Sequence, residues 1–193
     1  DFPSAVLKHH FPEIPNLGDV TKIEARHLEP LGQIDLVAFG FPCQDLSVAG
    51  KRAGLRHEDG QITRSGLFFE AMRIVRLTGA RISLAENVPG LFSSNGGKDF
   101  AAVVGEMAGV GVDVPDGGWR NSGFLVGPDA LVEWAVLDAQ FFGVPQRRRR
   151  VFIIRDTGDW WNRPPLLLIR ESLSGHPAPR REKGESVTHP VAP

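Results

Sequence analysis

The only cysteine of the chain, Cys43, stands in the segment GFPCQDLSVAGKR, directly after a run of strand-forming residues. Most cysteines pack as small apolar residues and are inert. A thiolate is a strong nucleophile, and a thiol with an ordinary pKa needs about 2 kcal/mol to become one at pH 7. Nearby arginines can offset that cost. From the residues alone, both a half-buried inert thiol and a nucleophile remain open.

Two other polar groups lie beside strand-forming runs. Glu86 and Asn87 end a second such run, and four consecutive arginines, 147–150, precede the last one. A carboxylate at the position of Glu86 either pairs with an arginine or exchanges a proton with a substrate. Side chains alternate along an extended segment, so Arg148 and Arg150 can face a site while the other two arginines face solvent.

Short apolar runs alternate with amphipathic segments, a pattern that predicts an α/β fold with a mostly parallel sheet. We expect strands at residues 34–40, 81–88, 131–139 and 150–156, and helices from Ser65 and over residues 99–108. The last two strands are separated by too few residues for a crossover helix, so this final strand pair should be antiparallel. A Gly-rich segment ahead of them is expected to form a hairpin around residues 115–118.

The three polar groups share one expected location. In open α/β sheets, ligands bind just beyond the carboxyl ends of the strands. Cys43 follows the first predicted strand, Glu86 and Asn87 end the second, and the arginines fill the turn before the last. We therefore expect all three groups to converge on one site.

Composition sets broader limits. The chain has 193 residues and a formal net charge of −1, so a polyanion would have to be bound by a local patch. A single cysteine allows no internal disulfide and indicates a reducing compartment. We expect no membrane span, because no apolar stretch reaches about 18 residues. We also expect no metal, because the six histidines are dispersed without ligand spacing.

Four segments in order, GFPCQDLSVAGKR, TRSGLFFEAMRIVR, ENVPGLF and AQFFGVPQRRRRVFIIR, resemble the cytosine-5 DNA methyltransferases of bacteria and phages. The resemblance covers residues 17–156. It implies a class I, Rossmann-like methyltransferase sheet, S-adenosylmethionine as methyl donor and cytosine in double-stranded DNA as target. It also implies a monomer in the cytoplasm of a bacterial cell or a phage-infected host.

The resemblance gives the polar groups catalytic roles. Cys43 would be the nucleophile that adds to C6 of a cytosine flipped out of the duplex. Glu86 would hold N3 of the base and supply a proton, while Asn87 fixes the local geometry. Arg150 would contact the base carbonyl, and Arg148 would brace Glu86.

Cofactor and DNA contacts follow from the same resemblance. Asp19 matches the acidic position that receives the adenine amino group of the cofactor. The other matches are Pro42 and Leu67 in the cofactor pocket, and Ser47, Lys51 and Arg64 as DNA contacts in a Gly-rich loop.

The sequence departs from the family at both ends. The glycine-rich cofactor loop and the ribose-binding acidic residue of the family have no counterpart here. We expect a partial catalytic domain over residues 1–157 and the Pro/Arg-rich start of a target-recognition region over residues 158–193. Such a truncated chain should bind cofactor weakly and have little activity. An RNA cytosine-5 methyltransferase and a catalytically silent nucleic-acid-binding module are the alternatives.

Overall fold

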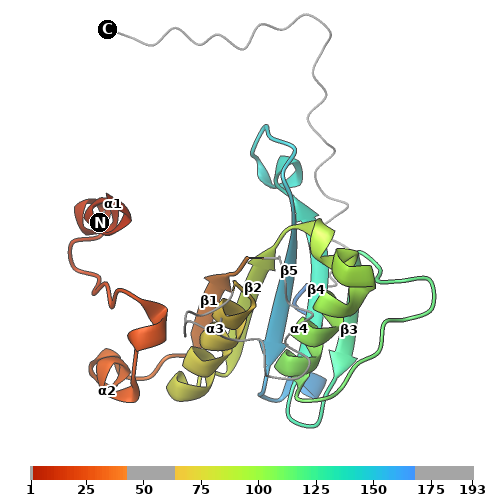
Figure 1. Ribbon diagram of the computed structural model, residues 1–193, viewed down its shortest axis with the longest axis horizontal. Coiled ribbons are helices and arrows are strands. Elements are labelled where there is room, and N and C mark those ends of the chain that lie inside the picture. The colour runs from red at the N-terminus through yellow and green to blue at the C-terminus, as the bar shows by residue number, and fades with distance from the viewer. Residues whose placement is uncertain (1, 43–63, 168–193) are drawn as a thin grey trace, which may run out of the picture.

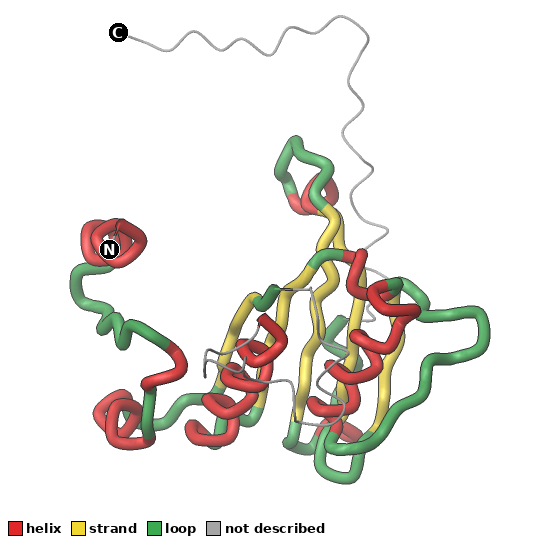
Figure 2. The backbone as a smooth tube through the Cα atoms, in the orientation of Figure 1, coloured by secondary structure: helices red, strands yellow, loops and turns green. Residues whose placement is uncertain are grey.

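The computed structural model describes residues 2–42 and 64–167, which form a five-stranded sheet with two long helices on one face (Figures 1 and 2). The strands are β1 (Leu36–Gly40), β2 (Ile82–Asn87), β3 (Ser122–Val126), β4 (Leu131–Asp138) and β5 (Arg149–Asp156). The α-helices are α1 (Phe2–His10), α2 (Ala25–Leu28), α3 (Arg64–Thr78) and α4 (Lys98–Ala108).

The strand order is β1-β2-β5-β4-β3. β1 and β2 are parallel, whereas β2–β5, β5–β4 and β4–β3 are antiparallel. The expected antiparallel final strand pair is confirmed, but the expectation of a mostly parallel sheet is wrong. The reason is that β5 inserts between β2 and β4 and runs against both. Only the α3 connection joins parallel neighbours.

The two predicted helices are confirmed as α3 and α4. Both lie on the same face of the sheet, α3 near β1 and β2, and α4 near β4 (Figure 1). Their apolar positions form the core with one face of the central strands. Its largest fully buried apolar side chains are those of Phe68, Met72, Leu91, Phe100, Val103, Val104, Met107, Val132, Val151 and Ile153.

The hairpin expected around residues 115–118 is displaced. A turn does form there, with the Gly118 amide donating to the Pro115 carbonyl over 2.9 Å. The paired strands, however, are β3 and β4, and their turn is closed by the Gly127 amide on the Ala130 carbonyl at 2.8 Å. The segment SGFLV alternates in exposure and forms an edge strand, which the Gly-rich surroundings obscured.

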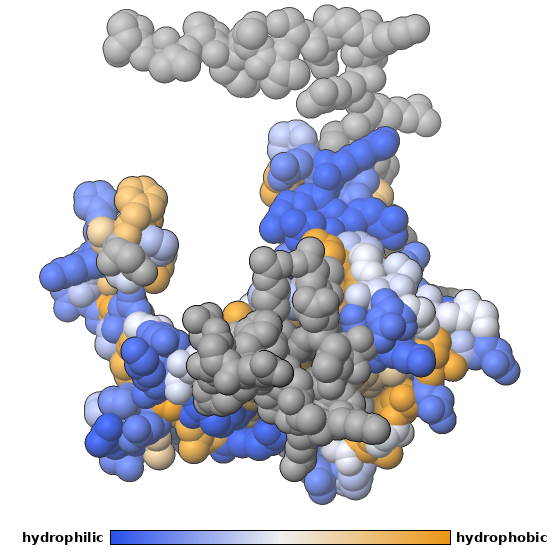
Figure 3. Space-filling view, viewed as in Figure 1, coloured by the Kyte–Doolittle hydropathy of each residue, from blue (hydrophilic) through white to orange (hydrophobic). Residues whose placement is uncertain are grey.

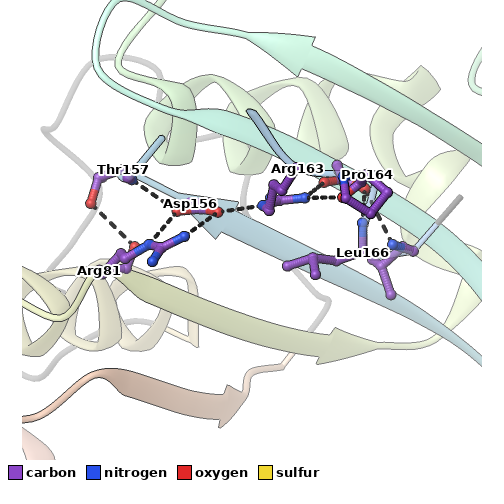
Figure 4. Close-up of polar contacts among 9 residues, drawn as sticks. Arg81, Asp156, Thr157, Arg163, Pro164 and Leu166 are labelled. Carbon is purple, nitrogen blue, oxygen red and sulfur yellow. Dashed lines mark hydrogen bonds and ion pairs between the residues drawn. The ribbon is translucent and has the colours of Figure 1, made fainter. Parts of the chain in front are cut away.

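At the end of β5, a cluster of charged side chains fixes the chain as it leaves the sheet (Figure 4). Asp156 is fully buried and receives Arg81 Nε at 3.1 Å and Arg163 Nε at 2.8 Å. Glu133, from β4, is also buried and receives Arg163 Nη1 at 3.0 Å. Arg163 therefore bridges two buried carboxylates from neighbouring strands.

The same cluster holds the following segment. Glu133 Oε2 accepts the backbone amides of Leu166 at 2.9 Å and Leu167 at 3.2 Å. The described residues after 157 are thus tied to the sheet. The boundary between a catalytic domain that ends at residue 157 and a target-recognition region that begins at residue 158 stays a prediction, because residues 168–193 lie outside the described part of the chain.

Candidate active site

The end of β1 is positioned by aromatic packing. Phe41 is buried, and its ring centroid lies 5.0 Å from that of Phe68 in the first turns of α3. Pro42 follows, and because proline has no amide hydrogen it cannot continue the ladder of the strand. Cys43 comes directly after Pro42 and lies outside the described residues.

The end of β2 is tied to the end of β1. Asn87 is buried, and its Nδ2 donates to the Phe41 carbonyl over 2.9 Å. Its Oδ1 accepts the Val88 amide at 2.8 Å, so that amide is withdrawn from the sheet ladder. Asn87 thereby fixes the backbone two residues before Cys43 against the strand that carries Glu86.

Glu86 pairs with two of the four consecutive arginines. Its Oε1 lies 2.8 Å from Arg150 Nε and 3.7 Å from Arg148 Nη2. The register pairs Glu86 with Phe152 on β5, which places the alternate residue Arg150 on the same face of the sheet. The side chain of Glu86 stays 35% exposed and can therefore be reached by a ligand.

The second oxygen of Glu86 points toward β1. Gly40 is paired in register with Glu86, and a Cβ built on Gly40 would lie 3.5 Å from Oε2. No described residue is recorded as a hydrogen-bond or ion-pair partner of Oε2. Glu86 therefore has one oxygen engaged by arginines and one oxygen, beside a residue without a side chain, that has no polar partner among the described residues.

Replacing Gly40 with alanine should disturb the site and leave the fold intact. The added methyl group makes an ordinary van der Waals contact with Glu86 Oε2, so we expect little change in the melting temperature. A ring bound against that oxygen would be displaced, and a shift of about 1 Å can cost about 100-fold in rate. The rate of a reaction at such a ring should fall at least tenfold. An unchanged rate would contradict the placement of a substrate beside Gly40.

The arginines are held by a turn that Asp138 closes at its base. The Asp138 carboxylate accepts the amides of Gln140 at 3.3 Å and Arg148 at 3.0 Å. The turn therefore starts and ends on one side chain, which sets where β5 begins. This explains how Arg148 and Arg150 come to reach Glu86 at the end of β2.

The residues expected to bind cofactor lie on three different elements. Leu67 is half-buried on α3, and Pro42 is exposed at the end of β1. Asp19 is exposed, and its Oδ1 accepts the amide and the hydroxyl of Thr21 at 3.0 and 2.9 Å. These hydrogen bonds, that of the amide first, lower the pKa of Asp19. Among the described residues, Asp19 has no hydrogen bond to Pro42 or Leu67.

Of the three residues expected to contact DNA, the structure describes only the backbone of one. Ser47 and Lys51 lie outside the described residues, as Cys43 does. Arg64 is the first residue of α3, and its side chain is not described.

Sequence reasoning missed Gly40 and Phe142. Gly40 ends a strand-forming run in FGFPC, but its position opposite Glu86 follows from strand register, for which the sequence holds no local signal. Phe142 ends a short 3-10 helix, η6 (Ala139–Phe142), in the turn before the arginines, and it is 53% exposed. An exposed aromatic side chain beside a run of cationic residues is typical of protein surfaces that bind nucleic acid.

The described residues contain no group of three or more histidine, cysteine, aspartate or glutamate side chains placed to hold a metal. Within the same part of the chain, no helix has the length and apolar character needed to cross a membrane.

Comparison with known proteins places these features in a family. The sequence profile described as C-5 cytosine-specific DNA methylase matches residues 4–162. A DNA N-6-adenine-methyltransferase of Escherichia phage P1 is 34% identical and covers 99% of this chain and 29% of that protein. The type II methyltransferase M.NgoBV of Neisseria gonorrhoeae is also 34% identical, over 91% of this chain and 35% of its own. This chain spans about a third of the length of these relatives.

Solved structures support the fold. The Entamoeba histolytica methyltransferase EhMeth aligns with a TM-score of 0.53 and 15% identity, over 86% of this chain and 45% of that one. A mutant of Spodoptera frugiperda DNMT2 aligns with a TM-score of 0.51 and 18% identity, over 85% and 42%. At these identities the likeness concerns the fold alone.

Proposed function

Because this chain belongs to the C-5 cytosine-specific DNA methylase family, we propose that it carries the catalytic centre of a DNA (cytosine-5) methyltransferase. The proposed substrate is a cytosine of double-stranded DNA, in the cytoplasm of a bacterial cell or a phage-infected host, and the proposed catalyst acts as a monomer. The observation that carries the proposal is Glu86, which Arg148 and Arg150 hold through one oxygen, while the other oxygen has no polar partner among the described residues.

The proposed chemistry begins with the thiolate of Cys43, which adds to C6 of the flipped cytosine. Glu86 Oε2 donates a proton to N3, so the ring nitrogen accepts the electron density that addition releases. C5 then has the electron pair needed to form a bond to the carbon of the transferred methyl group. Loss of the C5 proton to solvent, expulsion of the sulfur and return of the N3 proton to Glu86 restore the aromatic ring, the free thiolate and the protonated acid.

The arginines stabilise this chemistry in two ways. They keep Oε1 of Glu86 engaged, which orients Oε2 toward Gly40 and the base. Their charge also favours the thiolate of Cys43 and the negative charge that develops on the base carbonyl, and Arg150 is the proposed contact to that carbonyl. Asn87 fixes the backbone before Cys43 through its bond to Phe41.

The family uses S-adenosylmethionine, and this chain has a carboxylate and apolar side chains of the types that can bind that molecule. It supplies an electrophilic methyl group. Asp19 has a carboxylate oxygen, Oδ2, with no recorded partner among the described residues, and a carboxylate suits an amino group. Leu67 and Pro42 offer apolar contact near the end of β1. Ser47, Lys51 and Arg64 are proposed to contact the DNA backbone.

A covalent trap tests the proposal. Fluorine at C5 cannot leave as a proton does, so a cytosine carrying it should remain bonded to Cys43 after methyl transfer. Because the target sequence is unknown, all cytosines of a mixed-sequence duplex should be replaced by 5-fluorocytosine. The trap needs a single turnover, so with excess S-adenosylmethionine, stoichiometric protein and long incubation even a chain of little activity should give a denaturation-resistant adduct visible by mass spectrometry.

Cys43→Ala is the matched control and should form no adduct. An adduct that persists in this variant would remove Cys43 as the nucleophile. A protein that binds the duplex and never forms an adduct would be the binding module considered above.

The phage P1 relative favours a second candidate function, methylation of adenine, because its name specifies transfer to the N-6 position of that base. That reaction has no need of a thiol that attacks a ring carbon, whereas Cys43 stands where the family motif requires one. Nucleoside analysis of methylated DNA separates the two products. The same analysis on RNA substrates tests an RNA cytosine-5 methyltransferase.

A further inference from the structure

The connection between β4 and β5, residues 139–148, projects beyond the sheet edge at which β1 and β2 end; we call it the finger (Figures 1 and 2). Asp138 holds both ends of the finger through the amides of Gln140 and Arg148. The finger is therefore an anchored projection beside Glu86.

The finger and the start of β5 carry a local excess of positive charge. Residues 139–150 contain four arginines and no acidic residue, although the whole chain has a net charge of −1. Glu86 is the described carboxylate that pairs with this run. Arg147 and Arg149 are exposed and form no ion pair with a described residue. Figure 3 shows the hydrophilic surface of this projection. Such a patch attracts a polyanion.

A hollow of about 260 Å³ lies at the root of the finger. It is lined by Leu137, Ala139, Phe142, Arg148, Arg150 and Phe152. The apolar and aromatic members suit a flat ring, and the volume is below the range of sites for drug-sized ligands. Arg148 and Arg150 line the hollow and also pair with Glu86, so the hollow lies next to the candidate active site.

We propose that this hollow holds a second, unstacked base of the DNA strand, adjacent to the target base and stacked on Phe142. Arg147 and Arg149 contact the phosphates of the same strand. This inference rests on the proposed function and adds a subsite to it. Stacking on an exposed aromatic and cations along the backbone are the two interactions by which proteins bind single strands without regard to sequence.

Binding of fluorescent single strands to the 193-residue chain tests the stacking. One 12-nucleotide strand has mixed bases, and a second strand of equal length and charge has abasic sites throughout. Phe142→Ala should weaken binding of the base-containing strand about tenfold and leave the abasic strand unaffected. Phe124→Ala, which removes a 60% exposed ring from β3, is the matched control and should change neither.

Salt dependence tests the phosphate contacts. The double variant Arg147→Gln/Arg149→Gln should reduce the slope of log affinity against log salt by about 1.4, because each neutralised phosphate contributes about 0.7. Arg26→Gln, at an exposed position on α2, should leave the slope unchanged.

The outcomes separate the two proposals. If the unaltered chain binds neither strand but binds a duplex of the same base sequence, the subsite alone is overturned. If it binds neither the strands nor the duplex, the DNA substrate of the proposed function is overturned as well. If it binds, and Phe142→Ala has no effect or weakens both strands equally, the subsite alone is overturned. An unchanged salt slope in the double variant overturns the phosphate contacts.

Discussion

Glu86→Gln should lower the rate constant of methyl transfer about 100- to 10,000-fold, the usual contribution of a positioned acid or base. Glutamine has the same shape and keeps an oxygen for Arg150, which lies 2.8 Å from Oε1 in the unaltered protein. Its amide can still donate a hydrogen bond to N3 of the base but cannot transfer the proton. Single-turnover incorporation of a labelled methyl group should therefore show a large loss in rate and a small change in DNA affinity.

Glu106→Gln provides the matched control. Glu106 also pairs with an arginine, Arg76, but on α4, away from the strand ends. Its loss should change the rate less than twofold, because exposed ion pairs contribute at most about 1 kcal/mol to stability. If Glu86→Gln transferred methyl groups at nearly the original rate, proton donation by Glu86 would be wrong, whatever the role of Cys43.

The elements of this fold were predictable where local pattern determines them. β1 and β2 are continuous apolar runs, and α3 and α4 have helical spacing of large apolar residues, so both kinds of element were located within about two residues. The direction of most strand pairs was not predictable. It depends on the insertion of β5 between β2 and β4, and this pairing of strands that are distant in sequence cannot be predicted from local periodicity.

The candidate site shows the same division. Alternation along the arginine run correctly indicated that Arg148 and Arg150 share a face, because alternation is local. It was not predictable that one Glu86 oxygen would face the arginines and the other Gly40, since this depends on the register that sets Gly40 beside Glu86. Cys43 itself lies outside the described residues, and its role stays a proposal.

Arg163 is the clearest example of a residue whose importance only the structure reveals. It stands in a Pro- and Arg-rich segment whose composition resembles a linker. In three dimensions it bonds to both Asp156 and Glu133, which are distant in sequence from each other and buried on adjacent strands (Figure 4). Two buried carboxylates without a cation would be costly, so Arg163 allows both strands to keep them.

Asp156→Ala should lower the free energy of unfolding by about 3 kcal/mol, the cost of removing one partner from a buried ion pair. The substitution leaves Glu133 as the one described carboxylate paired with Arg163 and frees the amide of Gly158, which donates to Asp156 Oδ1 over 2.8 Å. Urea unfolding at pH 7 measures the change. Asp116→Asn, at an exposed position, is the control and should stay within about 0.5 kcal/mol of the unaltered protein.

The same carboxylate makes stability depend on pH. Burial raises the pKa of Asp156, but the hydrogen bonds from Arg81, the Gly158 amide and Arg163 together outweigh burial, so its pKa is lowered in the folded state. A folded-state pKa below the unfolded value, about 3.9, stabilises the protein above that pH, and the stabilisation is lost as the pH falls through the folded-state value. The difference in unfolding free energy between the unaltered protein and Asp156→Ala should therefore be constant from pH 7 to about 4.5 and shrink below pH 4. A difference that grew as the solution was acidified would mean that Asp156 is protonated in the folded protein, and the charged cluster at the end of β5 would need another explanation.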